Sequence, residues 1–259
     1  MAHIRPIEVV ESALRDSDSG MTDVKNARRH GVTVPTIRRW RRLYQRRGQP
    51  RGQAHLAARC PRCDEADLDS GAYAELLGWY LGDGHITRGR RDVYALHIYN
   101  DDKYPDLGAH VMDLMRLVKP ASRPHTRHMR GCVNITVSWK HWPCLFPQHG
   151  PGRKHLRSLE LEDWQRDIVE SEPADFLRGL FHSDGCRVNN WAQRTVAGEM
   201  KRYAYPRWQF VNHSPEIRQW CCEALDLVGV PWRLSSWKTV SVSTREGVAR
   251  LDDLIGPKR

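Results

Sequence analysis

Two aspartates, Asp83 and Asp184, stand at the same place in two similar motifs and are the residues of this chain best placed for chemistry. Residues 76–84 read LLGWYLGDG, and residues 177–185 read LRGLFHSDG. Paired carboxylates hold divalent cations, and such cations activate water and stabilise the leaving oxygen of a phosphodiester. The repeat therefore predicts a single two-fold active site for metal-assisted phosphodiester cleavage.

The residues before each aspartate predict how the two motifs meet. Small residues recur four positions apart in both copies, as Gly78 with Gly82 and Gly179 with Ser183. On a helix this spacing gives one smooth face, on which the backbones of two helices can touch. Helices packed in this way end side by side, so Asp83 and Asp184 should be neighbours. Gly84 and Gly185 should end the helices and leave a bound metal accessible.

The ends of two helices are an unfavourable place for two carboxylates, because both the helix dipoles and the like charges repel them. A fold that keeps them there is expected to hold cations, and oxygen ligands with room for phosphate favour Mg²⁺. We therefore expect Mg²⁺ at two or more sites. Its predicted ligands are Asp83, Asp184, Gly82 and Ser183.

The order of the segments after each motif repeats as well. A strand-rich stretch, an amphipathic helix, another strand and a Gly-Pro-basic segment follow in the same order twice. The matched segments are 94–100 with 207–212, 107–118 with 215–228, 133–138 with 238–243, and 150–154 with 256–259. This order predicts two equivalent halves, at residues 70–160 and 161–259.

The two motifs and their order resemble the LAGLIDADG homing endonucleases, over about residues 70–259. The resemblance implies an α+β fold, a pseudo-two-fold monomer of two αββαββα halves with the motif helices at its interface. It implies that each antiparallel sheet lies as a saddle in the major groove of double-stranded DNA, and that the last acid of each motif binds Mg²⁺. The family's earlier motif acid is replaced here by Leu81 and His182, which we assign to helix packing.

The resemblance also implies a basic residue near the metals, at the end of a sheet strand. Lys140 matches that position, and its counterpart in the repeat is Arg245. Arginine holds a phosphate but does not exchange protons as a lysine with a lowered pKa does. Ordinary surface charge is the alternative for both residues.

Strand alternation predicts which side chains face DNA. The residues expected to face the helices are Leu96, Ile98, Trp208 and Phe210. The opposite face then carries His97, Tyr99, Arg207 and Gln209, at base edges that Arg and Gln can read. Polar and basic residues expected in the hairpin loops, at phosphates, are Thr87, Arg88, Arg90, Arg91, Arg194, Lys201 and Arg202.

The first sixty residues carry most of the excess positive charge. They hold 13 Lys and Arg against 5 Asp and Glu, in a chain of 259 residues with a net charge of +10. Residues 1–48 are predicted to be helical, with Gly31 ending one helix and Thr33 and Pro35 opening the next. In this second helix Ile37 and Trp40 should face inward.

This arrangement resembles the helix-turn-helix of DNA-binding domains, whose second helix enters the major groove. The predicted DNA contacts are Thr36, Arg38, Arg39, Arg41 and Arg42. A helical hairpin with an arginine-rich surface is the alternative. This basic helical module therefore predicts a contact with DNA in addition to the contacts expected from the two sheets.

Residues 49–69 are predicted to form a basic linker that ends in a cysteine turn. Cys60 and Cys63 have the C-x₂-C spacing of half a zinc site. Candidates for the other half are Cys144, His149 and His155, although nothing in the sequence ties them to the pair. His141, His149 and His155 are candidates for a second metal site, and ordinary hydrogen bonding by loop histidines is the favoured alternative.

The composition excludes several classes of protein. Apolar residues make up 40% of the chain, and no stretch is long enough to cross a membrane. Seven cysteines, an odd number, argue against a secreted disulfide framework. We expect a cytoplasmic monomer, associated with the nucleoid when bound to DNA and without a protein partner.

The alternatives to a nuclease are a catalytically silent, sequence-specific DNA-binding regulator and an RNA splicing maturase.

Overall fold

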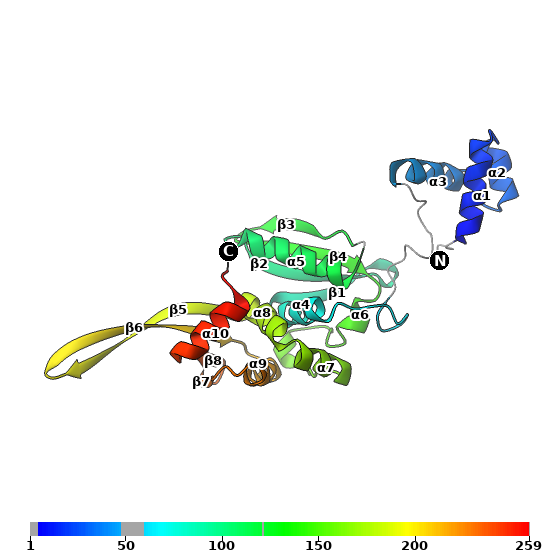
Figure 1. Cartoon of the computed structure of the whole chain (residues 1–259). Coiled ribbons are helices and arrows are strands. Elements are labelled where there is room, and N and C mark those ends of the chain that lie inside the picture. Colours follow the sequence, from blue (N-terminus) through cyan, green and yellow to red (C-terminus); the bar gives the residue numbers. More distant parts are fainter. Residues whose placement is uncertain (1–4, 48–59, 121, 259) are drawn as a thin grey trace. The chain divides into compact units, whose positions relative to one another are not determined.

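The computed structural model describes residues 5–47, 60–120 and 122–258. The chain divides into two compact units, unit 1 (Met1–Arg59) and unit 2 (Cys60–Arg259). Figure 1 labels the helices and strands of both units. None of the helices in these described ranges combines the length and apolar composition that crossing a membrane requires.

The described part of unit 1, residues 5–47, contains three helices: α1 (Ile7–Asp18), α2 (Asp23–Arg29) and α3 (Val34–Arg47). Their shared core consists of Val10, Ala13, Leu14, Ala27, Ile37 and Trp40, so Ile37 and Trp40 face inward as predicted. The buried Asn26 fixes α2 to α1, since its Nδ2 donates to the Ala13 carbonyl at 2.7 Å. Gly31, with a φ of +59°, turns the chain from α2 into α3.

Unit 2 contains two halves with one order of elements: helix, two strands, helix, two strands, helix. The first half is α4 (Ser70–Asp83), β1 (Gly84–Arg88), β2 (Tyr94–Asp101), α5 (Pro105–Val118), β3 (His125–Met129), β4 (Cys132–Trp139) and α6 (Trp142–Leu145). The second half is α8 (Pro173–Asp184), β5 (Gly185–Val196), β6 (Glu199–Val211), α9 (Pro215–Leu227), β7 (Arg233–Ser236), β8 (Thr239–Val242) and α10 (Arg245–Ile255). The predicted pair of αββαββα halves is confirmed.

Three short helices lie outside this repeat: η2 (Arg90–Asp92), η3 (Lys154–Leu156) and α7 (Asp163–Ser171). Each half has one four-stranded antiparallel sheet, with the order β1-β2-β4-β3 in the first and β5-β6-β8-β7 in the second. The two sheets therefore have the same topology, as an internal repeat requires.

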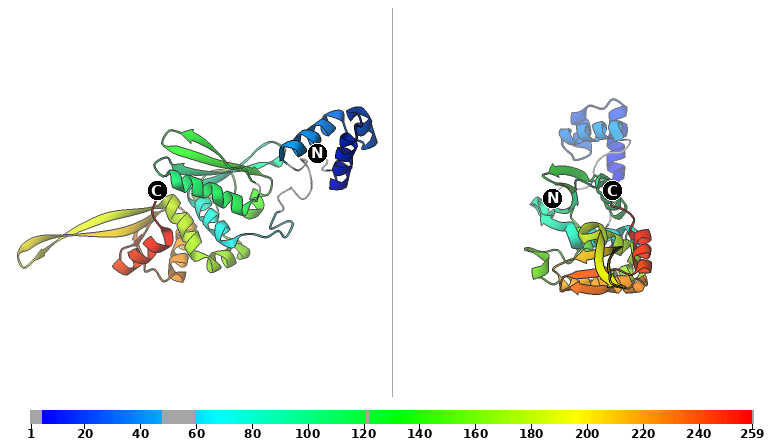
Figure 2. Two further views of the ribbon diagram at one scale, coloured as in Figure 1. Left: turned by 45° about the horizontal axis from the view of Figure 1, so that its top comes forward. Right: turned by 90° about the vertical axis from the view of Figure 1, so that its left-hand side faces the viewer.

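Helices α4 and α8 lie side by side (Figure 2). They pack backbone to backbone through their glycines. A Cβ atom on Gly78 would lie 2.5 Å from the carbonyl oxygen of Phe176, and one on Gly179 would lie 2.9 Å from the backbone nitrogen of Trp79. Any side chain at these positions would force the helices apart, because the atoms it meets belong to the backbone. The spacing of small residues thus positions the ends of the two helices.

The helices end at glycines as predicted, although not in the left-handed conformation that usually ends a helix. Gly84 has a φ of −101° and Gly185 a φ of −94°, both extended. Glycine is needed there for space, because a Cβ on Gly84 would lie 2.5 Å from the Cα of Tyr80 and one on Gly185 would lie 2.6 Å from the carbonyl oxygen of Phe181. The strand after each aspartate therefore folds back tightly over the last turn of its own helix.

The sheet faces alternate as the sequence predicts. Leu96 and Ile98 of β2 and Trp208 and Phe210 of β6 are buried against the helices. The alternate positions of the two strands lie on the opposite, half-buried face, and they are His97, Tyr99, Arg207 and Gln209. Each half thus presents one polar sheet face away from the apolar core.

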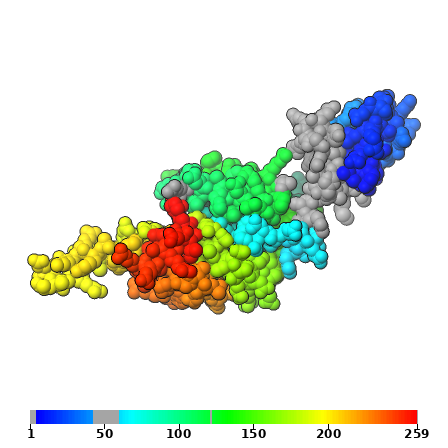
Figure 3. Space-filling model, viewed as in Figure 1, coloured from blue at the N-terminus to red at the C-terminus, as the bar shows by residue number. Residues whose placement is uncertain are grey.

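The hairpin of the second half is a long ribbon. Strands β5 and β6 have 12 and 13 residues, against 5 and 8 in β1 and β2. Figure 3 shows this ribbon, in yellow, extending beyond the rest of unit 2. The prediction of hairpin loops was wrong for Arg194, Lys201 and Arg202, which pair within the ribbon, and for Thr87 and Arg88, which belong to β1.

Candidate active site

The structure brings Asp83 and Asp184 together where α4 and α8 end. A Cβ atom on the neighbouring Gly82 would lie 3.4 Å from the Cγ of Asp184. Burial, and then the charge of Asp184, raise the pKa of Asp83 to about 6. The two carboxyl groups therefore form one electrostatic site, contributed equally by the two motifs.

The two carboxyl groups differ in their hydrogen bonding. Asn212, just after β6, donates its Nδ2 to Asp184 Oδ2 at 2.6 Å. Burial raises the pKa of Asp184, and this hydrogen bond opposes the rise. Among the described residues no side chain makes such a bond to Asp83. Asp83 is consequently the carboxyl group with less support for its negative charge.

Lys154 is a cation that sequence reasoning did not assign to this site. Its Nζ donates to the carbonyl oxygens of Tyr80, Leu81 and Gly82, at 2.6, 2.8 and 2.5 Å. These carbonyls are the unpaired acceptors at the C-terminal end of α4. Burial lowers the pKa of Lys154 to about 8, while the charges of Asp184 and Asp83 oppose that fall. Lys154 thus supplies a hydrogen-bond donor to the free carbonyls at the end of α4, and its charge also offsets the negative charge of the two aspartates.

Lys258 does the same in the second half, after α10. Its Nζ donates to the Gly185 carbonyl at 2.5 Å. Burial lowers the pKa of Lys258, and the charges of Asp83 and Asp184 are among those that oppose it. The repeated Gly-Pro-basic segments, 150–154 and 256–259, contain these two lysines. That repeat was the sequence signal for them, and only their place in the fold reveals its use.

A hollow of about 630 Å³ lies beside Asp184. Its basic wall is formed by Arg153, Lys154, His155, Arg157 and His213. Gly82 and His85 also line it, so the hollow reaches the end of α4. This hollow suits a phosphate group, because its cationic side chains attract the phosphate while the carboxylate of Asp184 can hold a metal ion.

His85 is another residue that the sequence did not single out. It follows Gly84 in β1, and its ring stacks on those of His97 and Tyr99 with centroid separations of 4.6 and 5.6 Å. Burial, His97 and Lys154 lower the pKa of His85. A neutral imidazole at this edge of the site can accept a hydrogen bond from a water or a sugar. The equivalent position in the second half is Cys186.

The other two predicted metal ligands are already engaged. The Gly82 carbonyl accepts from Lys154, which leaves one lone pair. The Ser183 hydroxyl donates to the carbonyls of Gly179 and Leu180 within its own helix, at 3.0 and 2.9 Å. Asp83 and Asp184 are therefore the stronger ligand candidates.

The predicted basic pair lies elsewhere in unit 2. Lys140 is exposed in the turn after β4, and its charge acts on Asp92. Arg245 is exposed in the first turn of α10. The lysines whose charges reach both motif aspartates are Lys154 and Lys258. Leu81 and His182, by contrast, are buried in the helix packing, as expected.

Predicted DNA contacts differ in how free their side chains are. Arg88 forms an ion pair with Asp92, while Arg90 and Arg91 are exposed in η2. His97 is held in the sheet, where its ring nitrogens contact Thr87 Oγ1 at 3.0 Å and Thr136 Oγ1 at 3.1 Å. The residues on the second sheet and its ribbon are Arg194, Arg207 and Gln209.

In unit 1 the predicted contacts separate into two sets. Asp23 forms ion pairs with Arg38 at 3.0 Å and with Arg41 at 3.3 Å. No ion pair is found for Arg39 or Arg42 within the described ranges. Thr36, Arg38, Arg39 and Arg42 line a hollow of about 530 Å³ on α3.

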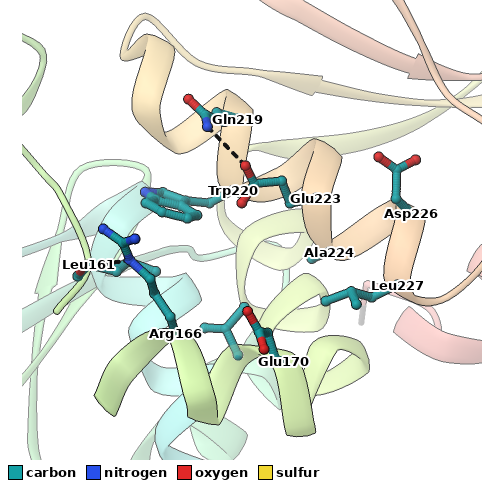
Figure 4. Close-up of a pocket in the computed structure, with 10 residues that line it drawn as sticks. Leu161, Arg166, Glu170, Gln219, Trp220, Glu223, Ala224, Asp226 and Leu227 are labelled. Carbon is teal, nitrogen blue, oxygen red and sulfur yellow. Dashed lines mark hydrogen bonds between the residues drawn. The ribbon is translucent and has the colours of Figure 1, made fainter. Parts of the chain in front are cut away.

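A further hollow, of about 580 Å³, lies between α7 and α9 (Figure 4). Arg166 of α7 sits over the Trp220 ring at 5.3 Å, and Gln219 donates to Glu223 at 2.9 Å. Neither motif aspartate lines it. This hollow is therefore separate from the aspartate site.

Comparison with known proteins gives matches among solved structures alone. The sequence matches no family model and no curated protein. The homing endonuclease I-DmoI in complex with DNA and Mn is 16% identical with a TM-score of 0.49, over 73% of this chain and 98% of that chain. The LAGLIDADG meganuclease I-AabMI bound to uncleaved DNA is 13% identical with a TM-score of 0.45, over 70% of this chain and 82% of that chain.

The homing endonuclease I-WcaI bound to its DNA recognition sequence is 12% identical with a TM-score of 0.43, over 74% of this chain and 84% of that chain. These solved structures are of the family that the two motifs resemble. At such low identity the function proposed below rests on the residues of this chain.

Proposed function

We propose that this protein is a site-specific endonuclease that hydrolyses double-stranded DNA as a monomer, with Mg²⁺ held by Asp83 and Asp184. The observation that carries the proposal is the meeting of these two carboxyl groups at the ends of α4 and α8, beside Lys154 and Lys258. Two repelling carboxylates that the packing of the helices forces together are a costly arrangement unless cations use it.

The donor set fits a divalent cation. Two carboxylates and the free lone pair of the Gly82 carbonyl are hard oxygen donors, the kind that Mg²⁺ prefers. Asp83, with its pKa raised to about 6, carries its charge at neutral pH. When bound, such an ion activates water and stabilises the leaving oxygen of a phosphodiester.

The chain's own cations supply the rest of the site. Lys154 and Lys258 are fixed by the carbonyls that they cap, so their charges stay beside the scissile phosphate without reorganisation. Arg153 lines the adjoining hollow and would hold a non-bridging phosphate oxygen, while Arg157 is fixed there by the carbonyls of Gln148 and Gly152. Asn212 orients Asp184 through its hydrogen bond.

The polar faces of the two sheets are the proposed DNA-reading surface. Arg207 lies half-buried on this face, and arginine reads guanine through its O6 and N7 atoms. His97 in the first sheet stands where the second sheet has Gln209, and Ala95 stands where the second sheet has Arg207. Two sheets with different readers favour a target that is only loosely palindromic.

Unit 1 is proposed to add affinity through α3. Arg39 and Arg42 are exposed and free of ion pairs among the described residues, so they are the side chains most available for phosphate. Replacing both with Ala should weaken DNA binding and reduce its dependence on salt concentration. The matched change is Arg38→Ala with Arg41→Ala, which removes arginines that Asp23 already neutralises. It should have the smaller effect.

A DNA-binding regulator without cleavage is the second candidate, and one observation favours it. Lys154 and Lys258 offset the charge of both aspartates without a metal ion, and Asn212 supports the charge of Asp184. A protein that had lost its nuclease activity would be stabilised by such a set. Binding and cleavage must therefore be measured separately.

The deciding experiment is selection from a randomised duplex library with Mg²⁺. The wild-type protein should cut both strands of a recovered sequence, whereas Asp83→Asn and Asp184→Asn should bind that sequence and leave it intact. Asp92→Asn, which changes an acid outside the site, is the control and should cut normally. Tight, specific binding by the wild type without any cleavage would establish the regulator instead. Cleavage by both motif variants would reject the proposed catalytic site.

A further inference from the structure

Four side chains that commonly bind metals meet at a second place in unit 2. Cys60, Cys63, His141 and Cys144 each offer one ligand atom, and these atoms all lie within 4.8 Å of one another. None of the four is a predicted part of the aspartate site. Cys60 and Cys63 come before α4, while His141 and Cys144 come after β4, so the fold brings together two distant segments.

The spacing of these atoms suits a tetrahedral metal. The sulfurs of Cys63 and Cys144 are 3.5 Å apart, and the Cys144 sulfur is 3.7 Å from His141 Nδ1. A tetrahedral zinc ion, with bonds of about 2.3 Å to sulfur and 2.0 Å to nitrogen, separates its ligand atoms by roughly 3.5–3.8 Å. A small adjustment of the side chains would place all four atoms on one ion.

The backbone of the first segment is folded as a tight metal-binding turn. The Cys60 carbonyl accepts from the Asp64 N–H at 2.8 Å, and the Cys60 N–H donates to Asp64 Oδ2 at 2.7 Å. Cys60 is itself buried, and its sulfur lies within 4.8 Å of the ligand atoms of the other three residues.

The second segment is equally well fixed. Trp142 is buried and donates its Nε1 to the Val137 carbonyl at 2.8 Å, which anchors α6 to β4. His141 precedes α6, and its carbonyl accepts from the Cys144 N–H at 3.0 Å. This single helical turn presents His141 and Cys144 to the same point. A ligand set held before the metal arrives binds it with less loss of entropy.

We propose that Cys60, Cys63, His141 and Cys144 form a structural zinc site that fastens the segment leading into α4 to the end of β4. Three thiolates and one imidazole are a donor set that selects zinc over magnesium. All four positions are occupied by protein, so the site would be closed and without catalytic water. This completes the half-site that the C-x₂-C spacing predicts, with Cys144 among the candidates and His141 in place of His149 and His155.

The site would act on the position of α4. The joined residues Cys63 and Cys144 are 81 positions apart, so a metal link removes much of the freedom of the unfolded chain. Arg62, between the two cysteines of the turn, also lies over the Trp164 ring of α7 at 4.6 Å. The turn therefore connects the start of the first half to the helix that precedes α8.

The test measures metal content and cobalt spectra of protein purified under reducing conditions without added metal. We expect about one zinc per chain, and visible bands of tetrahedral cobalt with thiolate charge transfer when Co²⁺ replaces the zinc. Cys63→Ser and Cys144→Ser should each lower the zinc content at least about tenfold. Cys132→Ser, a free cysteine outside the cluster, should keep it.

Two outcomes would overturn the proposal. One is a reduced wild-type protein with no zinc and no cobalt bands, a readout that needs no variant to fold. The other is a Cys63–Cys144 disulfide in intact protein, detected by mass spectrometry as the loss of two hydrogens. Asp83→Asn should retain the zinc, so failure at this site is distinguishable from failure of the proposed nuclease function.

Discussion

The two halves of unit 2 share one backbone plan but hold their aspartates differently. In the second half Asn212 donates to Asp184. The equivalent residue of the first half, Asn100, instead donates to the carbonyls of Asp101 and Tyr104 at 3.0 and 2.7 Å, where α5 begins. The same residue type thus supports a carboxylate in one half and a helix start in the other.

The lysines show the opposite imbalance. Lys154 makes three hydrogen bonds to the end of α4, whereas Lys258 makes one, to Gly185. Both lysines offset the charge of both aspartates, whereas the amide of Asn212 supports Asp184 alone. Because a cation acts through charge and an amide through one directed bond, Asp83 should respond more strongly to pH and to metal than Asp184.

The largest effect is expected where the halves touch. Gly82 and Ser183 are equivalent positions, and a Cβ on Gly82 would lie 2.5 Å from the Cβ of Ser183. Gly82→Ser should destabilise unit 2 by more than about 3 kcal/mol, because two side chains would then compete for the space of one. Urea unfolding followed by circular dichroism measures this loss.

The matched variant exchanges the two residues. Gly82→Ser combined with Ser183→Gly restores one small side chain at the contact, so it should recover most of the lost stability. If the exchanged variant is as unstable as Gly82→Ser alone, the halves are not equivalent at this contact. The glycine pair Gly78 and Gly179 offers no such exchange, because a Cβ there meets backbone atoms.

A second test concerns the protonation of Asp83. The pKa of Asp83 is about 6 in the folded protein against an ordinary 3.8, so the folded state binds this proton more tightly than the unfolded state. Stability should therefore fall as pH rises from about 4 to about 6. Asp83→Asn should remove that fall and stabilise the metal-free protein at pH 7 by up to about 3 kcal/mol.

Thermal unfolding in chelator at several pH values measures this difference. Below about pH 4 the variant and wild type should have similar melting temperatures, and above pH 6 their difference should stay constant. Asp92→Asn is the control, because the Arg88 ion pair lowers the pKa of Asp92 and gives no such gain. A wild type that is more stable than Asp83→Asn at pH 7 would show that Lys154 and Lys258 outweigh the burial of the carboxylate.

How far the sequence predicts this site depends on whether the signal is local. The signals of each motif are local: Gly78 stands four positions before Gly82, Gly179 stands four before Ser183, and an aspartate follows in each copy. They predict the helix contact and the meeting of the acids. Alternation along β2 and β6 likewise predicts the buried and open faces of both sheets. These patterns follow from the geometry of one helix or one strand.

Such local patterns do not predict that Lys154 and Lys258 lie beside the aspartates. Lys154 reaches Tyr80 across 74 positions and Lys258 reaches Gly185 across 73, through loops whose path no periodicity describes. The family resemblance led instead to Lys140, and the match between the halves led to Arg245. The first is exposed in the turn after β4 and the second in the first turn of α10. In the same way Cys60 and Cys63 predict half of a metal site, while His141 is recognised only once β4 is in place.

The third test compares the two lysines. Lys154→Met should lower the cleavage rate about a hundredfold, equivalent to about 2.7 kcal/mol, since it removes a fixed cation and leaves three helix carbonyls without their donor. Lys258→Met should cost less, because a single carbonyl loses its donor. Single-turnover cleavage of the selected duplex gives both rates. Equal losses would mean that charge alone matters, and that the capping of α4 contributes nothing to catalysis.

The substitution with the smallest expected effect makes the hydrogen bonding of the second half resemble that of the first. Asn212→Ala removes the amide that supports the negative charge of Asp184, so the pKa of that carboxyl should rise further above its ordinary value. The pH below which cleavage falls should then move upward as well. Asn100→Ala is the matched change in the first half, and it should leave this pH profile in place because Asn100 contacts neither aspartate. An Asn212→Ala profile identical to that of the wild type would mean that Asp83 alone sets the acid limit. In that case the difference in hydrogen bonding between the halves would have no consequence for catalysis, and the lysines would account for the whole asymmetry.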